Sequence, residues 1–185
     1  MKKVFIIHGF QGSPNGGWRP WLMAELEKQD IYACAIPMSK PEAPICAEWV
    51  EEISNIIESS IDDEIYLVGH SLGTPAILRY LELDSPQNIA GAVLVSGPIE
   101  KNNNRKIDSF LETSFDFGKI KSRCNKFLVV HGDNDPYVPL SNAETISKSL
   151  NAELVVVPSG GHLNGSSGWL QLPPVLDGLL KMMGV

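Results

Sequence analysis

The chain has 185 residues, of which 43% are hydrophobic and 20% are charged, and its formal net charge is −7 at pH 7. This length fits one domain with its own hydrophobic core, and no apolar run approaches the roughly 20 residues that a membrane helix needs. Because no local block of Lys or Arg reverses the negative charge, the composition argues against nucleic acids and membranes as partners. We therefore expect a single domain over residues 1–185.

The first ten residues, MKKVFIIHGF, share two lysines and a short apolar run with secretory signal peptides. His8 and Gly9 interrupt this run, however, and no small-residue cleavage site follows. The three cysteines are an odd number without CxxC spacing, which predicts neither a disulfide framework nor a zinc cluster. We expect a first β-strand here, reduced cysteines and a cytoplasmic location.

Short runs of β-branched residues alternate with longer amphipathic segments along the whole chain. Strands are predicted at residues 3–8, 31–36, 64–69, 89–96, 126–131 and 153–157. Segment 47–60 places apolar residues at helical spacing, and Ser141 with Glu144 forms a capping box that predicts the start of another helix. The fold class that we expect is α/β, a three-layer αβα sandwich with a mostly parallel sheet of about six strands.

The connection at residues 98–123 is long enough to form a small cap over a site at the edge of the sheet. Two interpretations are open. It forms either a cap with an apolar underside of Phe110, Phe115 and Phe117, or an irregular surface loop with a short helix. Because the rest of the segment is largely polar, we expect a shallow acyl pocket and a preference for short acyl groups.

The pentapeptide GHSLG at residues 69–73 joins a predicted strand to a helical stretch. This setting is that of a nucleophile elbow, in which a tight turn presents the central serine above the sheet. Glycines two residues to either side let the strand and the helix pack closely. We therefore predict that Ser71 is the nucleophile of an acyl-transfer reaction.

A serine hydroxyl needs a neighbouring base, and the base needs a carboxylate that fixes its tautomer. Two histidines follow Ser71: His131 ends a predicted strand, whereas His162 lies in a glycine-rich loop after the last strand and is favoured as the base. Asp133 and Asp135 are both candidates for the carboxylate. Asp135 is preferred because the proline after it favours an extended backbone, while Asp133 is expected to make hydrogen bonds within its own turn.

The oxyanion of a tetrahedral intermediate needs backbone N–H donors. One donor is expected from Leu72, the residue after the nucleophile, and the other from the loop after the first strand. In that loop Phe10 is our first choice and Gln11 the second. His8 and His70 are close by in sequence, but we expect neither to transfer protons.

Together these motifs resemble those of the small serine hydrolases grouped with retinoblastoma-binding protein nine and its bacterial relatives. The matching segments are HGF at 8–10, WRPWL at 18–22, GHSLG at 69–73, DNDPYVP at 133–139, GHLN at 161–164, GW at 168–169 and LP at 172–173. The resemblance implies a minimal α/β-hydrolase fold, a catalytic triad of Ser71, Asp135 and His162, and no metal or organic cofactor. It also favours Asp135 over Asp133.

An LxCxE motif links the name-giving member of that family to the retinoblastoma protein. The nearest string here is PICAE at residues 44–48, with proline in place of leucine, so this partner is not supported. Two functions fit the sequence: a serine hydrolase that cleaves a small ester or amide through an acyl-enzyme, and a hydrolase-fold binding or scaffold protein that has lost turnover. The complete set of catalytic roles favours the hydrolase. A dehydrogenase is excluded because the loop after the first strand lacks GxGxxG.

Overall fold

The computed structural model describes residues 1–60, 63–84 and 87–185. Within these residues, six strands form one sheet in the order β2-β1-β3-β4-β5-β6. All neighbouring strands in it are parallel. The strands are β1 (Lys2–Ile7), β2 (Tyr32–Ile36), β3 (Glu64–His70), β4 (Gly91–Val95), β5 (Phe127–Gly132) and β6 (Glu153–Val157). The predicted αβα fold class is confirmed, with a sheet that is parallel throughout.

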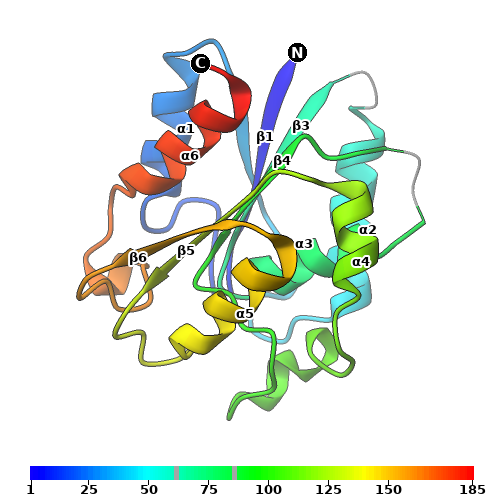
Figure 1. The fold of residues 1–185 in the computed structure, drawn as a ribbon, viewed down its shortest axis with the longest axis vertical. Helices are drawn as coiled ribbons and strands as arrows, with labels where there is room; N and C mark the ends of the chain where they lie inside the picture. The colour runs from blue at the N-terminus through cyan, green and yellow to red at the C-terminus, as the bar shows by residue number, and fades with distance from the viewer. Residues whose placement is uncertain (61–62, 85–86) are drawn as a thin grey trace.

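Helices cover both faces of the sheet (Figure 1). On one face lie α1 (Arg19–Glu27) and α6 (Pro173–Met183), and on the other lie α2 (Cys46–Glu58), α3 (Gly73–Leu81), α4 (Phe117–Arg123) and α5 (Leu140–Leu150). Two 3-10 turns, Arg105–Phe110 and Gly165–Ser167, complete the described elements. None of the helices in the described ranges has both the length and the hydropathy needed to cross a bilayer.

The core follows from the apolar periodicity of the sequence. In α2 the residues at helical spacing, Trp49, Ile53 and Ile57, are fully buried against the sheet. Burial of such side chains stabilises each by roughly 1.5–3 kcal/mol. The strands are covered on both faces and read as continuous apolar runs, as parallel sheets do.

The predicted capping box is wrong. Helix α5 begins at Leu140, and its N-cap position is taken by Pro139, whose ψ of 142° is not helical. An N-cap residue must stand outside the helix, and Ser141 already has a place within the first turn, where its carbonyl accepts the Thr145 hydroxyl.

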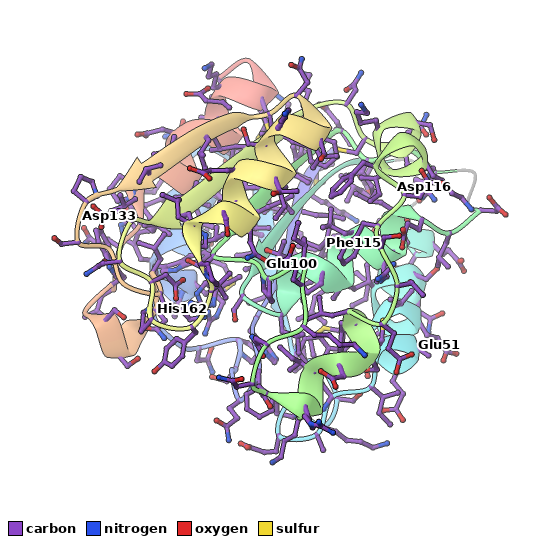
Figure 2. The ribbon with its side chains drawn as sticks, turned by 60° about the horizontal axis from the view of Figure 1, so that its bottom comes forward. Glu51, Glu100, Phe115, Asp116, Asp133 and His162 are labelled. Atoms are coloured by element: carbon purple, nitrogen blue, oxygen red, sulfur yellow. The ribbon has the colours of Figure 1, made fainter. Side chains whose placement is uncertain are left out.

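Segment 98–123 does not present an aromatic underside to the site. Phe110 is fully buried and packs edge-to-face on Trp49, with ring centroids 5.5 Å apart. Phe115 is also buried, and the Arg79 guanidinium lies over its ring at 3.9 Å. These rings anchor the segment to the helices of the α2 and α3 face, because burial of aromatic area there outweighs exposure over a wet pocket. In Figure 2, Phe115 lies well away from His162.

Candidate active site

Ser71 lies at the sharp turn between β3 and α3 with a left-handed backbone, φ 53°. This conformation is strained for a residue with a side chain. The flanking glycines make the turn sterically possible: a Cβ at Gly69 would lie 2.7 Å from the Gly73 carbonyl, and a Cβ at Gly73 would lie 2.2 Å from the Ile7 carbonyl oxygen. The Ser71 N–H donates to Val95 O at 2.8 Å. The turn therefore holds the Ser71 side chain at the carboxyl edge of the sheet.

Two further side chains reach this turn from other loops. His162, between β6 and α6, lies 2.9 Å from Ser71 Oγ through Nε2 and 2.7 Å from Asp135 Oδ2 through Nδ1. The carboxylate accepts the Nδ1 hydrogen, which leaves Nε2 unprotonated and able to accept the serine hydrogen. The side chains of His162 and Asp135 are 8% and 0% exposed, so water competes little for these bonds. The structure thus brings together the three residues that the sequence predicted as a triad.

Asp135 is held as an ionised carboxylate. Its Oδ1 accepts the N–H groups of Tyr137 at 2.9 Å and Val138 at 3.0 Å. Burial alone would raise its pKa, but the hydrogen bond and charge of His162, with the two backbone donors, outweigh burial and lower the pKa of Asp135 below its usual value. The group can therefore stabilise a positive charge that forms on His162.

Asp133, the alternative carboxylate, does not contact His162 but makes a hydrogen bond to another loop. Its Oδ1 accepts the N–H of Ser159 at 2.7 Å, which ties the loop after β5 to the loop after β6. The expectation that Asp133 bonds within its own turn is wrong, because Asp135 satisfies the N–H groups of that turn. Figure 2 shows Asp133 and His162 on these two neighbouring loops.

The loop that carries His162 is fixed by hydrogen bonds to its backbone, one from the nearby Trp169 and the others from distant parts of the chain. They are Gly161 N–H to Asn134 Oδ1 (2.7 Å), Trp169 Nε1–H to Gly160 O (2.7 Å), Trp18 Nε1–H to Leu163 O (2.8 Å) and His70 Nε2–H to His162 O (2.9 Å). Sequence reasoning assigned none of these positioning roles. A signal was present for the tryptophans, since a buried indole N–H needs an acceptor.

The remaining histidines have backbone partners. Burial lowers the pKa of His70 to about 3, so its ring stays neutral and donates from Nε2. Burial also lowers the pKa of His8, whose Nε2 accepts the Met38 N–H at 3.3 Å. His131 lies fully buried behind Asp135 and bonds to Val138 O at 2.9 Å rather than to Ser71.

Two backbone N–H groups are free to stabilise an oxyanion. Among the described residues, neither the Phe10 N–H nor the Leu72 N–H donates to another group, and both residues line a pocket together with Ser71. Leu72 also begins the first turn of α3, where the helix dipole favours negative charge. The Gln11 N–H, in contrast, donates to Pro41 O at 2.9 Å, which removes it from the candidate donors.

Ser71 and His162 stand between two pockets. One, of 290 Å³, lies towards the beginning of α1 and is lined by residues 9–13, 16, 17, 19 and 164–166. The other, of 670 Å³, is lined by Leu72, by residues 98, 102–104 and 107, and by residues 136–138. Asparagines 102–104 contribute to its wall together with Pro98 and Ile107, so segment 98–123 does reach the site, but without its phenylalanines. A substrate can therefore extend to both sides of the serine.

A strained serine after β3 and a histidine and an aspartate on the loops after β6 and β5 define an α/β-hydrolase-fold protein. A family model described as "Serine hydrolase" matches residues 4–181. The chain therefore belongs to the serine hydrolase family.

Two relatives and two solved structures are similar to the chain. The chain is 34% identical to YdeN of Bacillus subtilis (strain 168) over 178 residues, which cover 95% of this chain and 93% of that protein. It is 24% identical to the serine hydrolase RBBP9 of Rattus norvegicus over 171 residues, 89% of this chain and 88% of that protein. The crystal structure of the B. subtilis ydeN gene product superposes with a TM-score of 0.94 at 33% identity over the full length of both chains. Est1E of Butyrivibrio proteoclasticus, 17% identical, shares the fold with a TM-score of 0.79 over 100% of this chain and 90% of its own.

Proposed function

We propose that this protein hydrolyses small carboxylic esters, and more slowly amides, through an acyl-enzyme on Ser71. The observation that carries the proposal is the unbroken line of hydrogen bonds from Ser71 Oγ to His162 and from His162 to Asp135. Each group has the partner that its role requires, and the line ends beside two free backbone donors. We also propose a cytoplasmic location, because the three cysteines of the protein are free, as is usual in that reducing compartment.

Acylation begins when Ser71 Oγ attacks the carbonyl carbon of the ester. The hydroxyl proton passes to His162 Nε2, and the resulting imidazolium is stabilised by Asp135 through Nδ1–H. The carbonyl oxygen becomes an oxyanion that accepts the N–H groups of Phe10 and Leu72. As the tetrahedral intermediate collapses, His162 returns the proton to the leaving alcohol, and the acyl group stays on Ser71.

Deacylation repeats these steps with water as the nucleophile. His162 Nε2 removes a proton from water, the hydroxide attacks the acyl carbon, and the same two N–H groups hold the second oxyanion. The proton then moves to Ser71 Oγ, which releases the carboxylic acid. An alcohol leaves more readily than an amine, so we expect esters to be cleaved faster than amides at the same site.

Hydrolysis of p-nitrophenyl butyrate by purified wild-type, Ser71→Ala, His162→Ala and Ser141→Ala proteins tests the proposal. Ser141 is exposed on α5 and provides the control serine. We expect turnover in the wild type and in Ser141→Ala, and losses of about 10⁴–10⁶-fold in kcat for the two site variants. Circular dichroism would establish that all four proteins are folded. Equal turnover in Ser71→Ala would refute the assignment, and no turnover in any folded protein would favour the scaffold function.

A further inference from the structure

The arginine at the beginning of α1 is buried without an acidic partner. Arg19 is 5% exposed, and its Nε–H donates to Ser13 O at 2.9 Å. Within the described part of the chain no carboxylate forms an ion pair with it, and no acceptor for its Nη atoms is seen. Removal from water lowers the pKa of Arg19 to about 10, with no opposing charge to offset this effect. Buried cations are normally paired. Among the described residues, the guanidinium has a cation–π contact with the Trp18 ring at 5.9 Å, but its Nη groups have no hydrogen-bond acceptor.

The guanidinium belongs to the smaller pocket beside the nucleophile. Arg19, Ser71 and His162 all line this 290 Å³ cavity. The rest of its wall is built largely from small residues, and a Cβ at Gly16 would lie 2.5 Å from Arg19 Nη2. The guanidinium thus lies against the backbone of Gly16, in space that a larger residue would fill. A substrate group that enters this cavity beside Ser71 therefore shares it with Arg19.

We propose that this pocket binds a carboxylate carried by the substrate, with the Nη groups of Arg19 as its hydrogen-bond donors. The proposal rests on the proposed function, because it takes Ser71 as the nucleophile and adds the charge of the substrate. A guanidinium presents parallel N–H donors that match the two oxygens of a carboxylate. The chain as a whole is acidic, with a net charge of −7, so the attraction for an anionic group at this pocket comes from the local charge of Arg19 and not from the overall charge.

A singly charged anion fits this pocket better than a phosphate ester. Among the described residues, Arg19 is the only lysine or arginine that lines it, and burial keeps the neighbouring His70 neutral by lowering its pKa to about 3. A phosphate dianion would leave one negative charge uncompensated in a site removed from water. The volume of 290 Å³ also limits the charged arm to a short chain.

Matched esters test the charge preference and locate it. In one pair the charge is on the acyl group: the mono-p-nitrophenyl ester of glutaric acid is compared with neutral p-nitrophenyl 5-methylhexanoate, which has nearly the same shape. In the other pair the charge is on the leaving group: the butyryl ester of 4-hydroxybenzoate is compared with that of neutral 4-hydroxybenzamide. The readout is the ratio of kcat/KM, charged over neutral, at pH 7.5. The pair with the raised ratio shows which side of the scissile bond enters the Arg19 pocket. A butyryl ester of 4-hydroxyphenyl phosphate tests whether the pocket prefers a carboxylate to a phosphate dianion.

We expect one pair to give a ratio of about tenfold to a hundredfold in the wild type. Arg19→Met should bring that ratio to one or below. Gly16→Ala should also lower it, because the guanidinium must move away from the added methyl group. Lys148→Met, on the exposed side of α5, removes the same charge from the chain outside both pockets and should keep the wild-type ratio.

Ratios at or below one for both pairs in the wild type would overturn the inference, as would a stronger preference for the phosphate ester. An unchanged ratio in folded Arg19→Met would also overturn it, because a purely structural arginine would not set substrate charge. If Arg19→Met does not fold, the wild-type ratio and Gly16→Ala still decide the question. Failure to hydrolyse any of the esters would refute the proposed function, and this inference with it.

Discussion

The loops that hold the Ser71, His162 and Asp135 side chains differ from the loop that lines the larger pocket. The His162 loop is tied by side chains from β3, from the loop after β5 and from the start of α1. The asparagines at 102–104 bond within their own turn, through Asn104 N–H to Asn102 Oδ1 at 2.8 Å, and Asn103 is exposed. Reacting groups are thus fixed by long-range contacts, whereas the pocket wall is held from beneath by buried rings. Such a division lets the wall change without disturbing the chemistry.

Among the variants of these loops, the largest expected difference is between the two aspartates. Asp135→Asn should lower kcat about 10⁴-fold, because an amide can hold His162 in the wrong tautomer and cannot stabilise the imidazolium. Asp133→Asn should lower it less than about tenfold, since an amide oxygen still accepts the Ser159 N–H. Steady-state kinetics on both variants with one ester makes the comparison. A larger loss in Asp133→Asn would reassign the carboxylate.

A smaller effect distinguishes the fixed loop from the wall. Asn134→Ala removes the acceptor of the Gly161 N–H, and the loop that carries His162 should become less well positioned. We expect kcat to fall about twofold to tenfold, because this hydrogen bond is exposed and such a bond contributes about 0.5–1.5 kcal/mol. Asn103→Ala in the pocket wall should change kcat less than about twofold. Equal effects of the two substitutions would remove the distinction between the regions.

The acid stability of the fixed region should depend on His70. Its pKa is about 3 in the folded protein and about 6.5 in an unfolded chain, so below pH 6.5 the unfolded state binds more protons and stability falls as pH decreases towards 3. This single group contributes up to about 1.4 kcal/mol per pH unit within that window. His70→Gln keeps a donor for His162 O but does not titrate, so its stability should fall less steeply.

Urea denaturation of the wild type and of His70→Gln at several values between pH 7.5 and pH 5 measures the two slopes. His8, whose pKa is also lowered by burial, contributes with the same sign in both proteins and cancels in the comparison. Identical slopes would show that His70 is not held neutral in the folded state.

Much of the fold and of the site could be predicted from local patterns. The β-branched runs located all six strands because a strand covered on both faces is apolar along its length. Strand ends were less predictable: Ile89 was expected in the fourth strand but forms an isolated bridge to Cys124 instead. Ser71, Asp135 and His162 could be named because the order and setting of these residues are themselves local signals.

Contacts between residues far apart in the sequence could not be predicted from such local patterns. The bond between His70 and the His162 carbonyl joins residues 92 positions apart, and nothing near either residue encodes it. The burial of Arg19 without an acidic partner could not be predicted either, because the residues next to it in the sequence do not indicate which side chains pack against it. The position of the Phe110 ring was also not predictable, because its packing against Trp49 rather than in the pocket depends on contacts between segments far apart in the sequence.

The smallest expected effects concern acyl chain length. Each methylene that enters an apolar pocket contributes about 0.8 kcal/mol, but the walls at Asn102 to Asn104 are polar and those beside Arg19 are small. For p-nitrophenyl esters from acetate to palmitate, kcat/KM should rise over roughly the first few carbons and then level off or decline. A value still rising at palmitate would indicate a deep acyl channel.

The most direct test of the account is labelling by a fluorophosphonate, which phosphonylates a serine only where a base and an oxyanion hole are assembled. We expect one adduct per chain in the wild type, located on Ser71 by peptide mass spectrometry, with strongly reduced labelling in folded His162→Ala and none in Ser71→Ala. An unlabelled wild type, or an adduct of equal yield in Ser71→Ala, would contradict the claim that Ser71 is the nucleophile.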